Sequence, residues 1–186
     1  GGQEVPLDYA ATDRARTIDF RGYAWTRTPS DISGALATRY DETTPQIWRV
    51  PLRDEVVPAR SERAPLGGYV VPAAHASWMT AHLRLHGLQF MTLAEAMPGA
   101  EVETFRASTW TPAAASLEGR QRMALEGEWS PERRDVPAGS LFVPIAQPSA
   151  RLVVALMEPL APDSHAAWGR FNAHFERKEY MEAYVA

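Results

Sequence analysis

Residues 136–175 read VPAGSLFVPIAQPSARLVVALMEPLAPDSHAAWGRFNAHF, and this stretch carries the strongest structural signals in the chain. A Pro-Ala-Gly turn precedes a short apolar run over 140–145, which predicts a strand. Pro148 suits the first position of a helix, because that position needs no backbone donor, and the apolar segment 150–157 continues the helix. A second helix is expected beyond it, capped by Asp or Ser at 163–164. Its apolar side would carry Trp168, Phe171 and Phe175.

Residues 68–93 predict a strand, a helix and a second strand with short connections. The apolar run 69–71 ends at a proline, and the helical segment 75–86 is stopped by Gly87, a residue typical of helix C-termini. A second apolar run covers 88–93. Together these segments predict a right-handed parallel βαβ unit.

The segment after residue 101 has the pattern of antiparallel strands. Strands are expected over 102–110 and 121–129, and 141–145 is expected to pair next, as in a meander or part of a sandwich. The middle strand alternates: one face holds Met123, Leu125 and Trp129, and the other holds Arg122, Glu126 and Glu128.

The first third of the chain has fewer periodic runs. Strands are expected over 14–25 and 46–50, a turn at 30–34, and a loop over 52–68. The whole chain is therefore expected to be α+β, with one βαβ unit, an antiparallel sheet and two C-terminal helices. Its expected domains are an irregular β portion, 1–66, and an α+β domain, 67–186, which could also form one continuous domain, 1–186.

Composition narrows the function classes. The chain has 186 residues, a net charge of −4 and 45% hydrophobic residues, which is ordinary for a globular protein. Nucleic-acid binding is disfavoured because phosphate contacts need a basic surface. There is no cysteine, which excludes disulfides, a thiolate nucleophile and a cysteine-ligated zinc ion. No apolar run is long enough to span a membrane.

The stretch 136–175 also resembles a known group of proteins. It is similar to the region that follows the catalytic domain in bacterial zinc carboxypeptidases of the carboxypeptidase A-like superfamily. The matching residues are Pro137, Ala138, Gly139, Val143, Pro144, Gln147, Pro148, Ala150, Arg151, Leu152, Glu158, Pro159, Asp163, Ser164, Trp168, Phe171 and Asn172. Similar matches occur upstream at Phe20–Tyr23, Tyr40–Asp41, Gly68–Pro72 and His86–Gly87.

This resemblance implies a non-catalytic accessory region that packs on or orients a peptidase domain, or helps to present its peptide substrate. The family binds zinc through a His-x-x-Glu pair, and no histidine in this chain is followed three residues later by glutamate. The zinc ion is therefore expected in a separate catalytic domain, and no catalytic residue is assigned here. The chain begins Gly-Gly-Gln without methionine, which indicates a piece of a longer protein. The resemblance implies a periplasmic or extracellular location for that protein.

Three histidines offer a different hypothesis. His75, His82 and His86 are seven and four residues apart, so they fall along one side of a helix. The i, i+4 pair matches the spacing of helical zinc sites, which would suit a small metal-dependent hydrolase. The simpler interpretation is that these histidines pack in the core or cap the helix, because apolar residues flank them on both sides.

Two tryptophans suggest a further alternative. Trp110 and Trp129 are expected on neighbouring strands, where an aromatic platform could bind peptide or glycan in a stand-alone module. The competing interpretation is that they anchor the core. The sequence Asp163-Ser164-His165 invites comparison with a catalytic triad, but adjacent side chains point in different directions, so a helix cap is expected instead.

Overall fold

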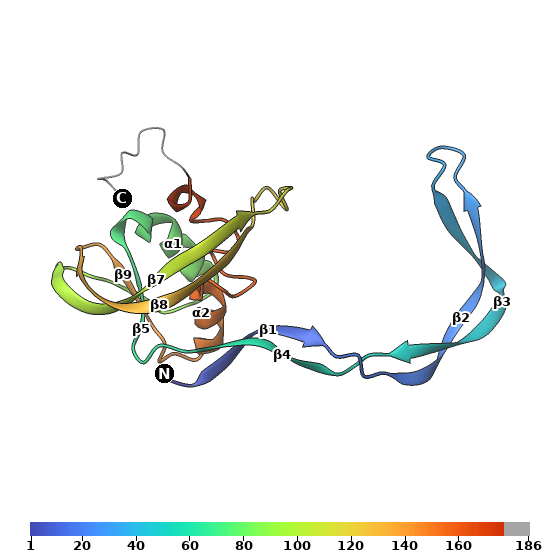
Figure 1. Ribbon diagram of the computed structural model, residues 1–186, viewed down its shortest axis with the longest axis horizontal. Helices are drawn as coiled ribbons and strands as arrows, with labels where there is room; N and C mark the ends of the chain where they lie inside the picture. The colour runs from blue at the N-terminus through green and yellow to red at the C-terminus, as the bar shows by residue number, and fades with distance from the viewer. Residues whose placement is uncertain (177–186) are drawn as a thin grey trace. The chain divides into compact units, whose positions relative to one another are not determined.

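The computed structural model describes residues 1–176 and shows an α+β fold built from antiparallel sheets and two α-helices (Figure 1). The chain divides into two units, one made of Gly1–Asp8 and Pro58 onward, and the other of Tyr9–Val57. None of the helices among the described residues is long and apolar enough to cross a membrane. The elements are β1 (Glu4–Ala11), β2 (Arg16–Pro29), β3 (Leu36–Leu52), β4 (Val56–Arg63), β5 (Gly68–Val71), α1 (Ala73–Leu85), β6 (Met91–Thr92), β7 (Met97–Pro112), β8 (Met123–Val136), β9 (Leu141–Pro144), α2 (Ala150–Met157) and the 3-10 helix η1 (Asn172–His174).

The sheet β5-β9-β6 is the centre of the larger unit. Strand β9 pairs antiparallel with both β5 and β6, so these two outer strands run parallel to each other with α1 as their connection. The predicted βαβ unit is confirmed, with β9 inserted between its two strands. Leu141 and Val143 of β9 are completely buried, as are Leu83 of α1 and Val153 of α2, which cover the sheet.

Helix α1 agrees with the predicted segment 75–86. It begins directly after Pro72 and ends ahead of Gly87, which has a φ angle of 65°. The N–H of Leu88 then bonds to the carbonyl of Leu83 at 2.9 Å, satisfying a carbonyl that the last turn leaves open. The glycine is needed because residues with a side chain rarely adopt this left-handed conformation.

The long hairpin β7–β8 shows the predicted alternation. Along β8, Met123, Leu125 and Trp129 lie on the more buried face, and Glu126 and Glu128 on the exposed face. The prediction that residues 141–145 form the third strand of this meander was wrong, because β9 pairs with β5 and β6 instead. The reason is the turn before β9, where hydrogen bonds from Gly139 to Leu93 and from Leu93 to Ser140 direct the chain away from β8.

The prediction of a second C-terminal helix after residue 163 was also wrong for the described residues. Residues 161–171 form successive turns, followed only by the short η1. Ser164 does cap this segment, because its hydroxyl accepts a hydrogen bond from the N–H of Ala167 at 3.0 Å. Gly169 has a φ angle of 71°, which ends helical geometry there. Residues 177–186, including the apolar positions Tyr180, Met181 and Tyr184, lie outside the described residues.

The unit Tyr9–Val57 consists mainly of the two-stranded ribbon β2–β3 (Figure 1). Its strands are joined by the expected turn at 30–34, and none of its side chains is buried. The ladder bulges beside Tyr23, next to Gly22, where an added Cβ would lie 2.6 Å from the indole of Trp48. The prediction of a loop over 52–68 was wrong, since β4 lies within this segment and pairs with β1.

The two leucines near the end of α1 provide a test of the core. Leu83→Ala is expected to lower the free energy of unfolding by about 2–5 kcal/mol, because it leaves a cavity at a fully buried position. Leu85→Ala, at a side chain that is 82% exposed, is the matched control and should change stability by less than about 0.5 kcal/mol. Denaturant unfolding of both variants measures the difference, and equal losses would contradict this packing.

Candidate functional site

His75, His82 and His86, which were expected to lie along one side of a helix, do not meet in one site. His75 and His82 are half-buried on α1, whereas His86 follows the helix and is exposed. The Nε2 atom of His75 lies 2.9 Å from Nε2 of His174, and Nε2 of His82 lies 2.8 Å from a guanidinium nitrogen of Arg170. Within residues 1–176 no three His, Cys, Asp or Glu side chains are grouped so that they could hold a metal ion.

These contacts surround Trp78 and form what we call the histidine clasp. The clasp joins α1 to the C-terminal segment, and four histidines take part in it: His75, His82, His165 and His174. The indole of Trp78 lies edge-on to the rings of His82 and His165, with ring centres 5.8 Å and 5.4 Å away. Arg170 lies over the same indole at 5.7 Å.

Two members of the clasp, His165 and His174, are not predicted from the sequence. The sequence pattern places His165 in the Asp-Ser-His triplet and indicates no role for His174. No local pattern would have revealed them, because each meets its partner across about ninety residues of chain. Their only signal was the presence of histidines on a segment otherwise rich in aromatic residues.

The hydrogen bonds of the clasp require neutral imidazoles. Trp78 donates from Nε1 to Nδ1 of His75 at 3.5 Å, so the proton of that ring lies on Nε2 and is donated to His174. Arg170 can only donate, so Nε2 of His82 must accept.

Burial also favours the neutral forms of His75, His82 and His165. It lowers the pKa of His75 and His82, and it lowers the pKa of His165 to about 4, with neighbouring His82 and Arg170 adding to the effect. Nε2 of His165 is buried and has no hydrogen-bond partner among the described residues. Protonation of His165 would therefore place an unpaired charge in the interior, which is costly.

A second polar centre lies at Glu158, directly after α2. Its side chain is only 3% exposed, and its two oxygens accept hydrogen bonds from the hydroxyl of Tyr69 at 2.5 Å and from Nε1 of Trp129 at 3.0 Å. Burial raises the pKa of Glu158, and the two donors only partly oppose that effect. Burial beside this carboxyl also raises the pKa of Tyr69. The centre links α2 to β5 and β8.

The expected pair Trp110 and Trp129 is split by the register of β7 and β8. Trp129 lies opposite Phe105 and donates its indole N–H to Glu158, whereas Trp110 lies opposite Leu125. Trp110 is 47% exposed and packs against Phe175, with ring centres 5.6 Å apart. The two indoles therefore have different neighbours, and only Trp110 is available at the surface.

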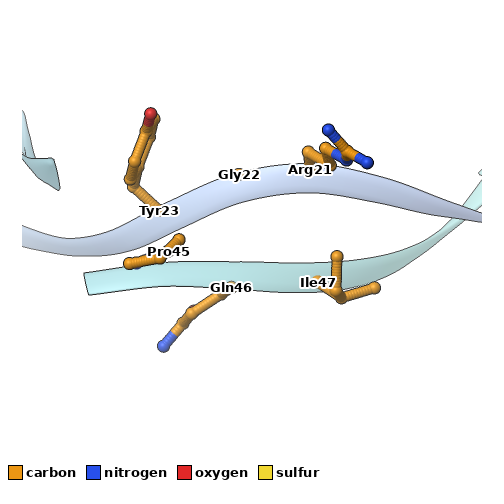
Figure 2. A pocket seen from close by; sticks show the side chains of 6 residues that line it. All are labelled: Arg21, Gly22, Tyr23, Pro45, Gln46 and Ile47. Atoms are coloured by element: carbon orange, nitrogen blue, oxygen red, sulfur yellow. The ribbon is translucent and has the colours of Figure 1, made fainter. Parts of the chain in front are cut away.

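The largest set of exposed aromatic side chains lies on the ribbon β2–β3. Phe20 stacks on Trp48 with ring centres 6.1 Å apart and an interplanar angle of 22°, and Tyr40 packs against the same indole. Beside the bulge lies a shallow hollow of about 360 Å³, where Arg21 and Tyr23 project to one side of the ribbon and Gln46 to the other (Figure 2). The exposed apolar side chains of the ribbon are Phe20, Tyr23, Trp25, Ile32, Leu36, Tyr40 and Ile47.

Glu158 can be tested by two substitutions. Glu158→Gln should keep the unfolding free energy at pH 7 within about 1 kcal/mol, because the amide oxygen still accepts from Trp129 and no charge is buried. Glu158→Ala should lower it by about 1–3 kcal/mol, since the Tyr69 and Trp129 donors lose their acceptor. The wild type should also lose stability as the pH rises above about 4.5, because the carboxyl of Glu158 ionises more readily in the unfolded chain than in its buried position. Neither variant should show this loss, because neither has that carboxyl. Equal effects of both substitutions would contradict this assignment.

The histidine clasp should make stability depend on pH in the opposite direction to Glu158. The free energy of unfolding is expected to fall as the pH drops from about 6.5 towards 4, because an unfolded histidine takes up its proton near 6.5 whereas His165 resists until about 4. Each such histidine contributes up to about 1.4 kcal/mol per pH unit. Denaturant unfolding of the Glu158→Gln variant at several pH values measures this slope without the opposing carboxyl.

In that background His165→Phe should reduce the slope, because it removes the most strongly buried imidazole while keeping a ring of similar shape. His86→Phe is the matched control, since His86 is exposed and makes no contact in the clasp. A slope that is the same in all three proteins would show that the clasp does not control acid stability.

Comparison of this chain with family models, with curated proteins and with solved structures gives no match. The resemblance to the region after the catalytic domain of zinc carboxypeptidases therefore stays a prediction from the sequence. The distinctive features of the described residues are the exposed ribbon β2–β3, the histidine clasp and the polar centre at Glu158.

Proposed function

We propose that this chain is a non-catalytic accessory module of a zinc carboxypeptidase-like protein, and that the ribbon β2–β3 is the surface that packs on the catalytic domain. The observation that carries the proposal is that the unit Tyr9–Val57 contains no buried side chain. The resemblance in the sequence suggests the class of partner, and the ribbon suggests the surface.

An isolated two-stranded ribbon has little to hold it together in water. Independent stability usually needs a third strand or a helix packed on an apolar face. This ribbon is also long, with strands of 14 and 17 residues, and it exposes Phe20 at 51%, Trp25 at 49% and Ile47 at 59%. The register places Phe20 and Trp48 on one face of the ribbon and Ile47 on the other, so each face exposes apolar surface of the kind that is typical of an interaction site.

Although the ribbon lacks a covering layer in the described part of the chain, local contacts order the side chains around its bulge, which favours docking. Gly22 allows the indole of Trp48 to lie across the strand, so that Phe20, Tyr40 and Trp48 form one aromatic cluster. Asp41 accepts hydrogen bonds from Thr43 and Thr44, which fixes the bulged part of β3 and lowers the pKa of Asp41. A surface held in one shape loses less conformational entropy on binding.

The other two hypotheses find less support in the contacts. A metal-dependent hydrolase would need the imidazole nitrogens that the clasp uses for hydrogen bonds, and a glycan platform would need Trp129, which is bonded to Glu158. The proposed module carries no catalytic residue of its own, and its zinc ion would belong to the partner domain. The proposed location is periplasmic or extracellular, as the resemblance implies.

Hydrogen exchange of the full chain tests the proposal. Alone, the amides of β2 and β3 should exchange much faster than those of β5, β9 and α1, because no packed layer covers them. Addition of the purified catalytic domain of a zinc carboxypeptidase-like protein from the same genome should slow exchange across the ribbon. A ribbon that exchanges equally fast at saturating catalytic domain would contradict the proposal.

Two variants sharpen this experiment. Phe20→Ser combined with Tyr40→Ser should weaken binding of the catalytic domain by about tenfold or more, because it removes two members of the aromatic cluster around Trp48. Leu85→Ser, at an exposed leucine outside the ribbon, should leave the affinity unchanged. Calorimetry or surface plasmon resonance measures both, and equal effects would place the contact elsewhere.

A further inference from the structure

An open cavity of about 460 Å³ is lined entirely by residues of the larger unit. It is bounded by the start of β8, by the segment that follows α2, and by positions on β1 and β4. Its size is within the range of small-molecule sites. The side chains that matter for its chemistry are Asp8, Arg60, Arg122, Met123, Leu125 and Leu160.

Arg122 is held firmly at this cavity. One of its terminal nitrogens donates to the carbonyl of Pro162 at 2.9 Å, and its guanidinium lies 5.0 Å from the centre of the Trp168 indole. Trp168 is itself positioned by a hydrogen bond from Nε1 to Asp163 at 3.3 Å. A guanidinium has five N–H donors, so this anchoring leaves most of them for a ligand.

The cavity combines positive charge with an apolar floor. Arg60 and Arg122 both line it, and neither forms an ion pair with any other residue in the part of the chain that the structure describes. Asp8 is the one acidic residue in the lining, so the guanidinium groups outnumber the carboxylates. Met123 is 7% exposed and Ala161 is 1% exposed, which gives the floor a fixed apolar surface.

From these contacts we infer that the cavity binds a small carboxylic acid with a short branched or straight apolar chain. The carboxylate is held by Arg122 and Arg60, since a guanidinium presents paired donors that match both oxygens. The apolar chain lies on Met123, Leu125 and Leu160. No residue of the ribbon lines this site, so the inference does not depend on the docking function proposed above.

Titration of the full chain with 4-methylpentanoate tests the inference. Saturable binding should appear in calorimetry and should change the fluorescence of Trp168, which lies under Arg122. The uncharged amide 4-methylpentanamide has nearly the same shape and should bind at least about tenfold more weakly, because it lacks the charge-assisted pairs. Absence of saturable binding by the acid, or equal binding of acid and amide, would overturn the inference.

Two substitutions assign the binding to this cavity. Arg60→Gln removes an exposed charge without disturbing the packing, and should weaken binding of the acid by about tenfold. Arg122→Lys keeps the charge but loses the paired donors and should also weaken it. Arg133→Gln, on β8 but outside the cavity, is the control and should bind as the wild type does. Unchanged affinity in both cavity variants would show that the acid binds elsewhere.

Discussion

The pairing of β9 with two strands at once is the constraint on which the larger unit depends. Because β9 is antiparallel to both β5 and β6, these strands are parallel and α1 must cross from one to the other. Leu141 and Val143 place their side chains in the core, where Leu83 of α1 and Val153 of α2 meet them. Burial of these side chains is the main favourable contribution to folding of this unit.

The same arrangement determines where the polar residues go. With α1 fixed on the sheet, its side bearing His75, Trp78 and His82 meets the C-terminal segment, and the clasp forms there. With α2 fixed beside it, Glu158 reaches Tyr69 and Trp129. Both centres bury groups that must stay neutral or be fully hydrogen-bonded, so they link the stability of the fold to pH in opposite directions.

The ribbon β2–β3 differs from the core because no second layer of described residues covers its side chains. Its strands alternate and pair well, yet the aromatic side chains that would normally be covered by a second layer remain exposed. A partner that covers them would supply the burial that the ribbon lacks, which is why interaction rather than catalysis is the role that its geometry favours.

The sequence by itself determined the features that depend on neighbours within a few residues. It was sufficient for the approximate limits of α1, the apolar segment 150–157 that forms α2, the alternation along β8 and the turn at 30–34, because helix and strand periods and turn residues act locally. The tertiary structure alone decided that β9 leaves β8 for β5 and β6, that His165 and His174 meet α1, and that Trp129 bonds to Glu158 while Trp110 stays exposed. These contacts join residues far apart in the chain, and the burial and hydrogen bonding that select them exist only once the sheet and both helices have packed together.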